Sequence, residues 1–336
     1  MKISFSKIKS FLLAATICVG VSACSDDDDS SVVTPVTPAT DATTVQLSMG
    51  ENYGTQMYYD IESNKVLATN AISDWTLAFA NGASDRKITL NYATGARAMK
   101  IVDCTYDNLD LAYADKLNLD NFQYDTDETP AIDGWYSDGN VVSNLYLIHN
   151  GTDVSGEDLG FSKITVTAYN GSSYTIKYAD LSQGTSHEET ITKSGNATFR
   201  FLDIPNSTVK DLEPNGQWDL LFTKYTTYVT MGGESTWHSV VGVLIKTPGT
   251  TGALMPDTVF NDVTLASLDN VTLTSQRDVI GYNWKSISMS TMLYTADPTM
   301  IYAIRTDDDN TFALHFTDFY DESGIKGAPK FEFKKL

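Results

Sequence analysis

Few of the side chains that build common active sites occur in this sequence. There are only 4 histidines and 3 cysteines among 336 residues. The chain also lacks a Gly-Xaa-Ser-Xaa-Gly nucleophile motif, a His-Glu-Xaa-Xaa-His metal motif, a phosphate-binding glycine loop and a paired-cysteine zinc pattern. These absences leave little material for catalysis, so the sequence predicts a protein that is not an enzyme.

Positive charge is scarce as well. The 23 Lys and Arg residues stand against 43 Asp and Glu residues, which gives a formal net charge of −20. Because an acidic chain repels phosphate backbones, the composition argues against a nucleic-acid partner.

The hydrophobic run near the N-terminus, residues 11–21, is too short to span a bilayer as a permanent helix. Three lysines precede it, and the small residues Ser22 and Ala23 lead directly to Cys24. This order is typical of a lipoprotein signal peptide over residues 1–23, with Cys24 as the lipidated first residue of the mature chain. The alternative is an ordinary secretory signal in which Cys24 is incidental.

An acidic run, Asp26 to Asp29, follows the predicted lipidation site. It resembles the export signal that follows the lipidated cysteine in surface lipoproteins of Bacteroidota, although a solvated tether is the alternative. Residues 24–44 as a whole are acidic and then rich in Ser, Thr and Pro, which predicts an extended, disordered linker. We therefore expect a protein that is anchored by lipid to the outer membrane and exposed on the cell surface.

Cysteine usage excludes an internal disulfide. Cys18 leaves with the signal peptide and Cys24 carries the lipid, so Cys104 has no partner.

Alternating hydrophobic and polar residues predict an all-β fold. Phe312, Leu314 and Phe316 alternate with smaller or polar residues, which is the period of a half-buried strand. His315 belongs to the other face, so we expect it at the surface or lining the sheet. Hairpin turns are predicted at short intervals by these dipeptides: Asn81-Gly82, Asp133-Gly134, Asp138-Gly139, Asn150-Gly151, Asn170-Gly171 and Asn215-Gly216.

The sequence also predicts two related halves, with a boundary near residue 190. The stretch that begins at Asp74-Trp75 parallels the one at Gln217-Trp218, and each follows a strand-like segment that starts near Val45 or Ile191. Residues 145–149 likewise parallel residues 301–305, and Trp135 and Trp284 precede these segments at comparable distances. The predicted domains are therefore residues 45–189 and residues 190–336.

The second of these halves resembles a known family. The motifs that carry the resemblance are Trp218 to Tyr225, Val240 to Leu244, Phe316 to Tyr320, Lys326 to Pro329 and Phe331 to Phe333. They are similar to the HmuY family of haem-binding lipoproteins of Bacteroidota, and the first half resembles it more faintly. The resemblance implies an all-β fold that takes haem from host haemoproteins and passes it to a TonB-dependent outer-membrane receptor.

Members of that family hold haem between two axial side chains, histidine in some and methionine in others. One axial position lies after a tryptophan that corresponds to Trp284, which points to Met289. The other lies between the strand at 240–245 and Trp284, where Met255 is the soft donor, and thioether sulfur is a plausible iron ligand. His238 is a third candidate beside the pocket.

Two readings stay open for these residues. Methionine also fills irregular cores, so Met289 and Met255 could be packing residues. A shared fold does not guarantee a shared ligand, and the chain could be a non-haem binding or assembly module for a glycan or a protein.

Overall fold

The computed structural model describes residues 41–126, 129–231 and 233–336, which fall within one compact unit. The predicted signal peptide, Cys24 and the acidic run lie outside the described residues. Within the described residues, no helix is long and apolar enough to cross a membrane.

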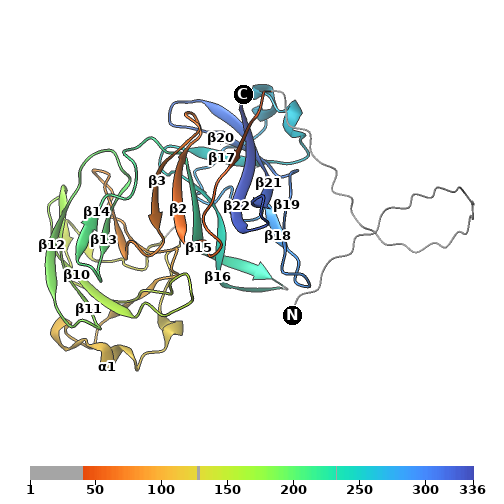
Figure 1. Cartoon of the computed structure of the whole chain (residues 1–336). Coiled ribbons are helices and arrows are strands. Elements are labelled where there is room, and N and C mark those ends of the chain that lie inside the picture. The colour runs from red at the N-terminus through yellow and green to blue at the C-terminus, as the bar shows by residue number, and fades with distance from the viewer. Residues whose placement is uncertain (1–40, 127–128, 232) are drawn as a thin grey trace, which may run out of the picture. The chain divides into compact units, whose positions relative to one another are not determined.

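The all-β prediction is confirmed (Figure 1). The described residues contain 22 strands. The first eleven are β1 (Thr43–Gln46), β2 (Thr55–Asp60), β3 (Lys65–Ala71), β4 (Leu77–Ala80), β5 (Ile88–Leu90), β6 (Arg97–Ile101), β7 (Tyr136–Ser137), β8 (Asn140–Val141), β9 (Leu145–His149), β10 (Phe161–Tyr169) and β11 (Ser173–Asp180).

The remaining eleven are β12 (His187–Thr192), β13 (Phe199–Asp203), β14 (Thr208–Lys210), β15 (Leu220–Met231), β16 (Glu234–Ile245), β17 (Thr251–Met255), β18 (Lys285–Ile287), β19 (Tyr294–Ala296), β20 (Ile301–Arg305), β21 (Thr311–Tyr320) and β22 (Lys326–Lys335). The helices are short: α1 (Leu111–Ala114) and the 3-10 turns η1 (Tyr106–Asn108), η2 (Leu119–Asn121), η3 (Phe260–Asp262) and η4 (Leu265–Leu268).

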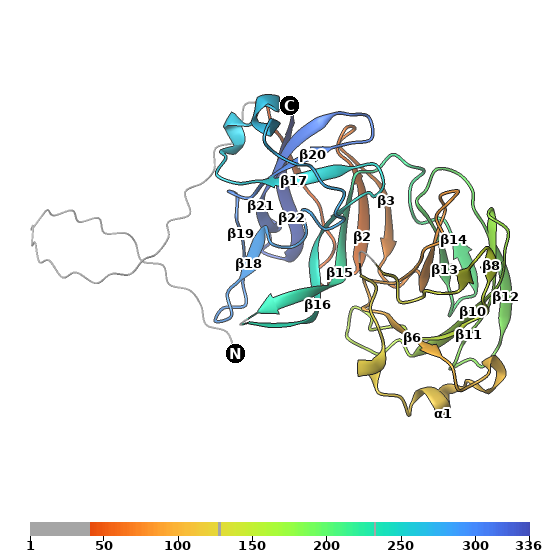
Figure 2. The same ribbon diagram turned by 180° about the vertical axis from the view of Figure 1, so that it is seen from behind.

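The sheets form two sets with the same strand order. Adding eleven to each strand number of one set gives the other set, with the count continuing from β22 to β1. One five-stranded sheet runs β6-β9-β10-β11-β12, and the other runs β17-β20-β21-β22-β1. The four-stranded sheets β5-β4-β13-β14 and β16-β15-β2-β3 follow the same rule, as do the hairpins β7-β8 and β18-β19. Figures 1 and 2 show the two sets of sheets side by side in the molecule. The fold therefore consists of two related β-rich halves, as the sequence predicted.

Contacts repeat along with the topology. The indole of Trp75 meets the ring of Phe201 edge-on at 5.3 Å, and Trp218 meets Tyr58 in the same way at 5.1 Å. The amide of Ile204 donates to Thr76 at 3.1 Å, and the amide of Ile61 donates to Asp219 at the same distance. Equivalent residues of the two halves differ in number by 143: Trp75 corresponds to Trp218, and Ile61 corresponds to Ile204.

The two halves exchange their first three strands. β1 pairs with β22 and β2 pairs with β15, whereas β12 pairs with β11 and β13 pairs with β4. We call β1–β3 and β12–β14 the two arms. The predicted boundary near residue 190 falls inside β12, and strands on either side of it belong to common sheets.

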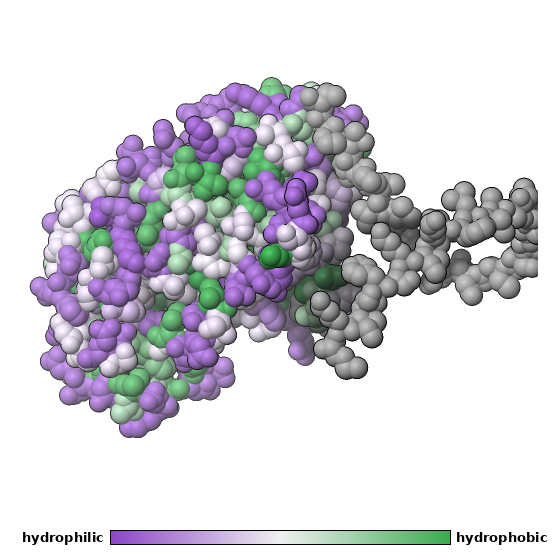
Figure 3. All heavy atoms as spheres, in the orientation of Figure 1, coloured by the Kyte–Doolittle hydropathy of each residue, from purple (hydrophilic) through white to green (hydrophobic). Residues whose placement is uncertain are grey.

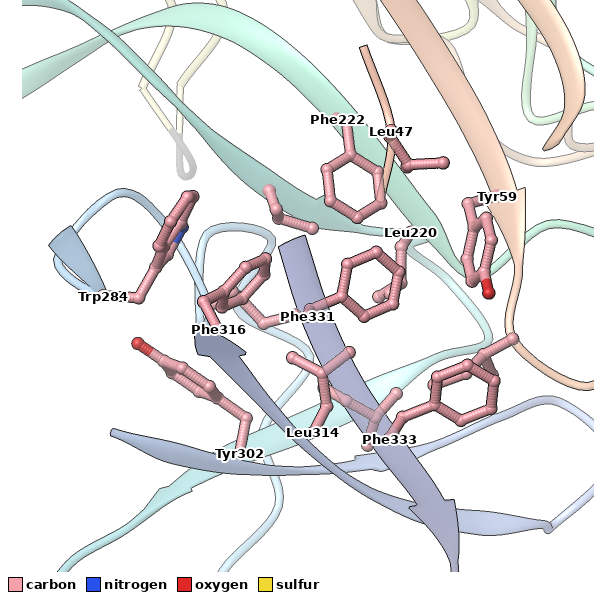
Figure 4. Close-up of a cluster of buried hydrophobic side chains, with 14 of the residues drawn as sticks. Leu47, Tyr59, Leu220, Phe222, Trp284, Tyr302, Leu314, Phe316, Phe331 and Phe333 are labelled. Carbon is pink, nitrogen blue, oxygen red and sulfur yellow. The ribbon is translucent and has the colours of Figure 1, made fainter. Parts of the chain in front are cut away.

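Two large cores fill the halves. The core drawn in Figure 4 contains Phe222 from β15, Phe316 from β21 and Phe331 from β22, and the arm residue Tyr59 packs edge-on against Phe331 at 5.4 Å. The other core contains Phe79 and Tyr174 together with the arm residue Leu202. Each core thus includes side chains from an exchanged arm.

The expectation that His315 lies at the surface or lines the sheet needs correction, because both faces of β21 are covered. The ring of His315 is fully buried and stacks on Phe260 of η3 at 4.0 Å. Its Nε2 lies 3.3 Å from Glu332 and its Nδ1 lies 2.9 Å from the carbonyl oxygen of Pro298. Strand periodicity identified the core face but could not identify the segment that covers the opposite face.

The outer surface is mixed in character. On the face in Figure 3, hydrophobic residues form small patches separated by hydrophilic ones. Such scattered exposure is ordinary for a protein whose hydrophobic side chains are mostly inside.

Candidate ligand-binding site

The clearest departure from the repeat is the hairpin β15–β16. Each of its strands has 12 residues, whereas the corresponding strands β4 and β5 have 4 and 3. The two long strands pair from Leu220 and Ile245 out to Met231 and Glu234. The second half therefore carries a hairpin that projects well beyond the length of its counterpart in the first half.

A cavity of about 500 Å³ lies between this hairpin, the hairpin β18–β19 and the loop that carries Tyr53. Figures 1 and 2 show the outer ends of the two hairpins near one another. We call this cavity the His238 cavity. Its walls are mainly apolar or aromatic, and its lining side chains include Tyr53, Val229, Val240, Val241, Tyr282, Ile287 and Tyr294. The other lining residues are polar: Lys224, His238, Ser239, Lys285 and Ser286.

Lys285 is held in place by aromatic rings. Its neighbour Trp284 stacks on Phe316 at 4.0 Å, which fixes the start of β18 on the core. The Lys285 ammonium lies 4.3 Å from the Trp284 ring and 4.8 Å from the Phe319 ring, and it donates a hydrogen bond to the carbonyl oxygen of Val241. Burial lowers the pKa of Lys285 to about 7, because a charge in this apolar setting loses its hydration.

Lys224 is the second cation of the His238 cavity. Burial lowers its pKa, and the carboxylate of Asp153 partly opposes that effect. Among the described residues, neither Lys224 nor Lys285 forms a salt bridge with a carboxylate. The cavity therefore combines apolar walls with two lysines that form no salt bridge in the described part of the chain.

Two of the three predicted ligand residues are near this cavity. His238 lines it directly, from the half-buried middle of β16 opposite Thr227. Met289 lies in the loop between β18 and β19, next to the lining strands, and its side chain is 77% exposed. The amide of Tyr294 donates to the hydroxyl of Tyr320 at 2.8 Å, which ties this hairpin to β21.

Met255 is elsewhere in the fold. It ends β17, is 2% exposed, and packs in a separate core with Phe260, Val263 and Ile301. It does not line the His238 cavity. The structure therefore brings His238 and the Met289 hairpin together and leaves Met255 in a packing role.

Sequence reasoning missed the two lysines and Tyr53. Lys285 follows Trp284 directly, so a cation beside a predicted site tryptophan was an available signal. Tyr53 could not be found in this way, because it precedes β2 and joins the site only through the exchange of arms.

An all-β chain with an apolar, cation-lined cavity of this size has the geometry of a small-molecule binding protein. Sequence comparison gives the particular family: the family model described as HmuY protein matches residues 52–333, and the chain belongs to the HmuY family. That family is associated with haem binding and not with catalysis. The match runs from before β2 into β22, so it includes parts of both halves. No curated protein matches the chain significantly.

Three solved structures also align with about half of the chain. A putative lipoprotein from Bacteroides fragilis is 16% identical, over 50% of this chain and 91% of its own, with a TM-score of 0.21. A putative HmuY-like heme binding protein from Bacteroides vulgatus is 13% identical, over 51% and 90%, with a TM-score of 0.24. Apo PinO from Porphyromonas gingivitis is 17% identical, over 52% and 95%, with a TM-score of 0.18. The family assignment rests on the family match alone.

Proposed function

We propose that this protein binds haem in the His238 cavity and acts as a surface haem carrier. The observation that supports the proposal best is the pairing of apolar walls with an imidazole and two lysines that form no salt bridge with the described residues, in a chain of the HmuY family. A porphyrin needs an apolar cleft, its two propionates need cations, and its iron needs axial donors. The residues of the cavity supply the apolar walls, the lysines and one donor, His238, and the loop that borders the cavity supplies Met289.

The axial donors we propose are His238 and Met289. The imidazole of His238 is already at the cavity wall, whereas Met289 is exposed on a hairpin loop that borders the cavity. An exposed methionine on a loop has freedom to move toward a ligand. Met255 was the other predicted donor, but it could reach iron only by leaving its core, which makes it the weaker candidate.

Lys224 and Lys285 would bind the propionates. A carboxylate beside Lys285 restores the charge that burial disfavours, so its pKa would rise when haem binds. Bound haem supplies the iron that is carried, and the protein supplies apolar burial, axial donors and charge pairing.

A haem titration of the purified protein, in the ferric and ferrous states, tests this proposal. We expect a Soret shift and a low-spin spectrum, with both the affinity and the spin state altered by His238→Ala and by Met289→Leu. The matched control is Met255→Leu, a volume-conserving change in the core that should leave the spectrum as it is.

Three outcomes would change the assignment. If Met255→Leu alone alters the spin state, the second axial donor is Met255. If no single variant alters it, the axial donors are other residues. If the wild-type protein gives no Soret shift in either redox state, the chain is a non-haem binding or assembly module.

The wider role that we propose is haem capture from host haemoproteins and delivery to a TonB-dependent outer-membrane receptor, by a protein anchored through Cys24 and exposed on the cell surface. The support is the family membership together with the signal-peptide sequence. Replacement of Cys24 by serine should release the protein from the membrane fraction. Alanine at residues 26–29 should keep the lipid but remove the protein from the reach of external protease. Persistent membrane association of the Cys24→Ser protein would exclude the lipid anchor.

A further inference from the structure

A second cavity, of about 520 Å³, borders the same projecting hairpin. It lies where strands of the first half meet β15 and β16 of the second. Its lining residues are Lys87, Thr89, Tyr92, Asp125, Thr126, Tyr225, Thr226, Thr227, Tyr228, Trp237, Leu244, Arg277 and Asp278. We call it the Asp125 cavity. We propose that it binds an uncharged sugar unit of a glycan.

Two hydroxyl groups of this cavity have no hydrogen-bond partner among the described residues. They are Oγ1 of Thr89, whose residue is 5% exposed, and Oγ1 of Thr226. A buried hydroxyl without a partner is unfavourable, because its lost hydration is not replaced by another hydrogen bond. Both oxygens are shielded in this side-chain position, so a ligand hydroxyl would satisfy each of them after the threonine side chain turns toward the cavity, because a hydroxyl both donates and accepts.

A carboxylate and a guanidinium provide further polar contacts. The Oδ2 atom of Asp125 accepts from the amide of Leu90 and its Oδ1 accepts from the amide of Ala131, both at 2.7 Å. Each oxygen therefore keeps acceptor capacity for a ligand hydroxyl. The Nη2 atom of Arg277 donates to the hydroxyl of Tyr92 at 3.0 Å, so the guanidinium is held in place with other N–H groups available.

Aromatic rings form the outer wall. The Trp237 ring lies 4.7 Å from the ring of Tyr124 and 5.3 Å from the ring of Tyr228, and the Tyr228 residue is 59% exposed. Rows of partly exposed aromatic rings suit the apolar C–H face of a pyranose, while its hydroxyl groups reach the polar floor. The cavity thus offers both kinds of surface that a sugar presents.

Charge balance distinguishes this cavity from the first. Lys87 and Arg277 are matched by Asp125 and Asp278, so an anionic ligand gains no net attraction there. The His238 cavity, by contrast, is lined by Lys224 and Lys285 and, among the described residues, by no carboxylate. The Asp125 cavity therefore favours an uncharged polar ligand, and the proposal does not depend on haem binding at the other site.

Saturation-transfer difference NMR with the methyl glycosides of galactose, mannose, glucose and N-acetylglucosamine tests the proposal. At least one of these glycosides should show saturation transfer from the wild-type protein. Thr89→Val removes an unpartnered hydroxyl without changing the side-chain shape, and Tyr228→Ser removes an exposed ring. Each should weaken the affinity for that glycoside about tenfold.

Thr165→Val is the matched control. Its hydroxyl in β10 is also buried and without a partner, but Thr165 does not line the Asp125 cavity, so glycoside binding should be unchanged. Circular dichroism and haem titration of each variant check the fold and the other cavity. The absence of transfer to all four glycosides, or an equal affinity of Thr89→Val and wild type, would overturn the proposal. Displacement of a bound glycoside by haem would assign this cavity to haem instead.

Discussion

At the scale of single residues, Lys285 makes the most direct prediction. Burial lowers its pKa to about 7, whereas an unfolded chain restores the ordinary value of 10.5. Between these values the unfolded state holds a proton that the folded state has released, so the free energy of unfolding rises with pH. The slope approaches about 1.4 kcal/mol per pH unit for one proton.

We expect Lys285→Met to remove this dependence. In urea unfolding of the haem-free protein between pH 7 and pH 9.5, the free energy of unfolding of wild type should rise relative to that of the variant as the pH rises. The difference between the two proteins isolates Lys285, because all other titrating groups are common to both. A constant difference over that range would mean that the lysine is hydrated in the folded state.

The candidate site was only partly predictable from single residues. His238 drew attention because it adjoins Trp237, and Met289 because it follows Trp284, and both signals are local in sequence. Met255 fitted the same order along the chain, but its burial depends on η3 and β20, which sequence spacing does not reveal. Lys224 and Lys285 become notable only in the structure, which buries them beside one cavity without a salt bridge to any described residue.

At the scale of elements, one buried glutamine joins four segments. Gln56 on β2 is completely buried, and its Nε2 donates to Oγ1 of Thr223 on β15 at 2.8 Å. Its Oε1 accepts from Nδ2 of Asn70 on β3 at 2.9 Å and from Nε1 of Trp75, just before β4, at 3.0 Å. This residue therefore couples an exchanged arm to both halves.

Gln56→Leu should be strongly destabilising, because it leaves the indole N–H of Trp75 buried without an acceptor and removes one of the two acceptors of the Asn70 amide. We expect a loss of about 2–4 kcal/mol in the free energy of unfolding, measured by urea denaturation. Gln183→Leu is the control, since that glutamine is exposed and bonds only at the surface; its effect should stay within about 0.5 kcal/mol. Equal effects of the two substitutions would show that the buried network contributes nothing specific.

At the scale of the whole molecule, we propose that the chain arose from two copies of an eleven-strand unit, residues 43–180 and 187–335, that exchange their arms. Separate fragments 41–186 and 187–336 would each lose the partners of one arm. Each fragment alone should form aggregates or arm-exchanged dimers, and co-expression should restore a 1:1 complex, as judged by size-exclusion chromatography with light scattering. A monomeric, well-dispersed spectrum of fragment 187–336 alone would favour the independent domain that the sequence predicted.

Much of this architecture was readable in the sequence. Residues 145–149 and 301–305 are the strands β9 and β20, and Val45 and Ile191 lie in β1 and β12, which hold equivalent places. The exchange was not readable. Alternation tells which residues face a core, but β1 has the same pattern whether it pairs with β11 or with β22, and that choice depends on contacts between distant parts of the chain.

The pairing of β1 with β22 has a mechanical consequence. Thr43 lies opposite Phe333, and the ladder continues from there through Gln46 to the amide of Met49, which donates to Gly327 at 2.8 Å. A pull on Thr43 directed away from the sheet would open these hydrogen bonds one after another, because β1 is an edge strand and its ladder begins at that residue. Under tension β1 would detach first, at low force, and would expose the edge of β22.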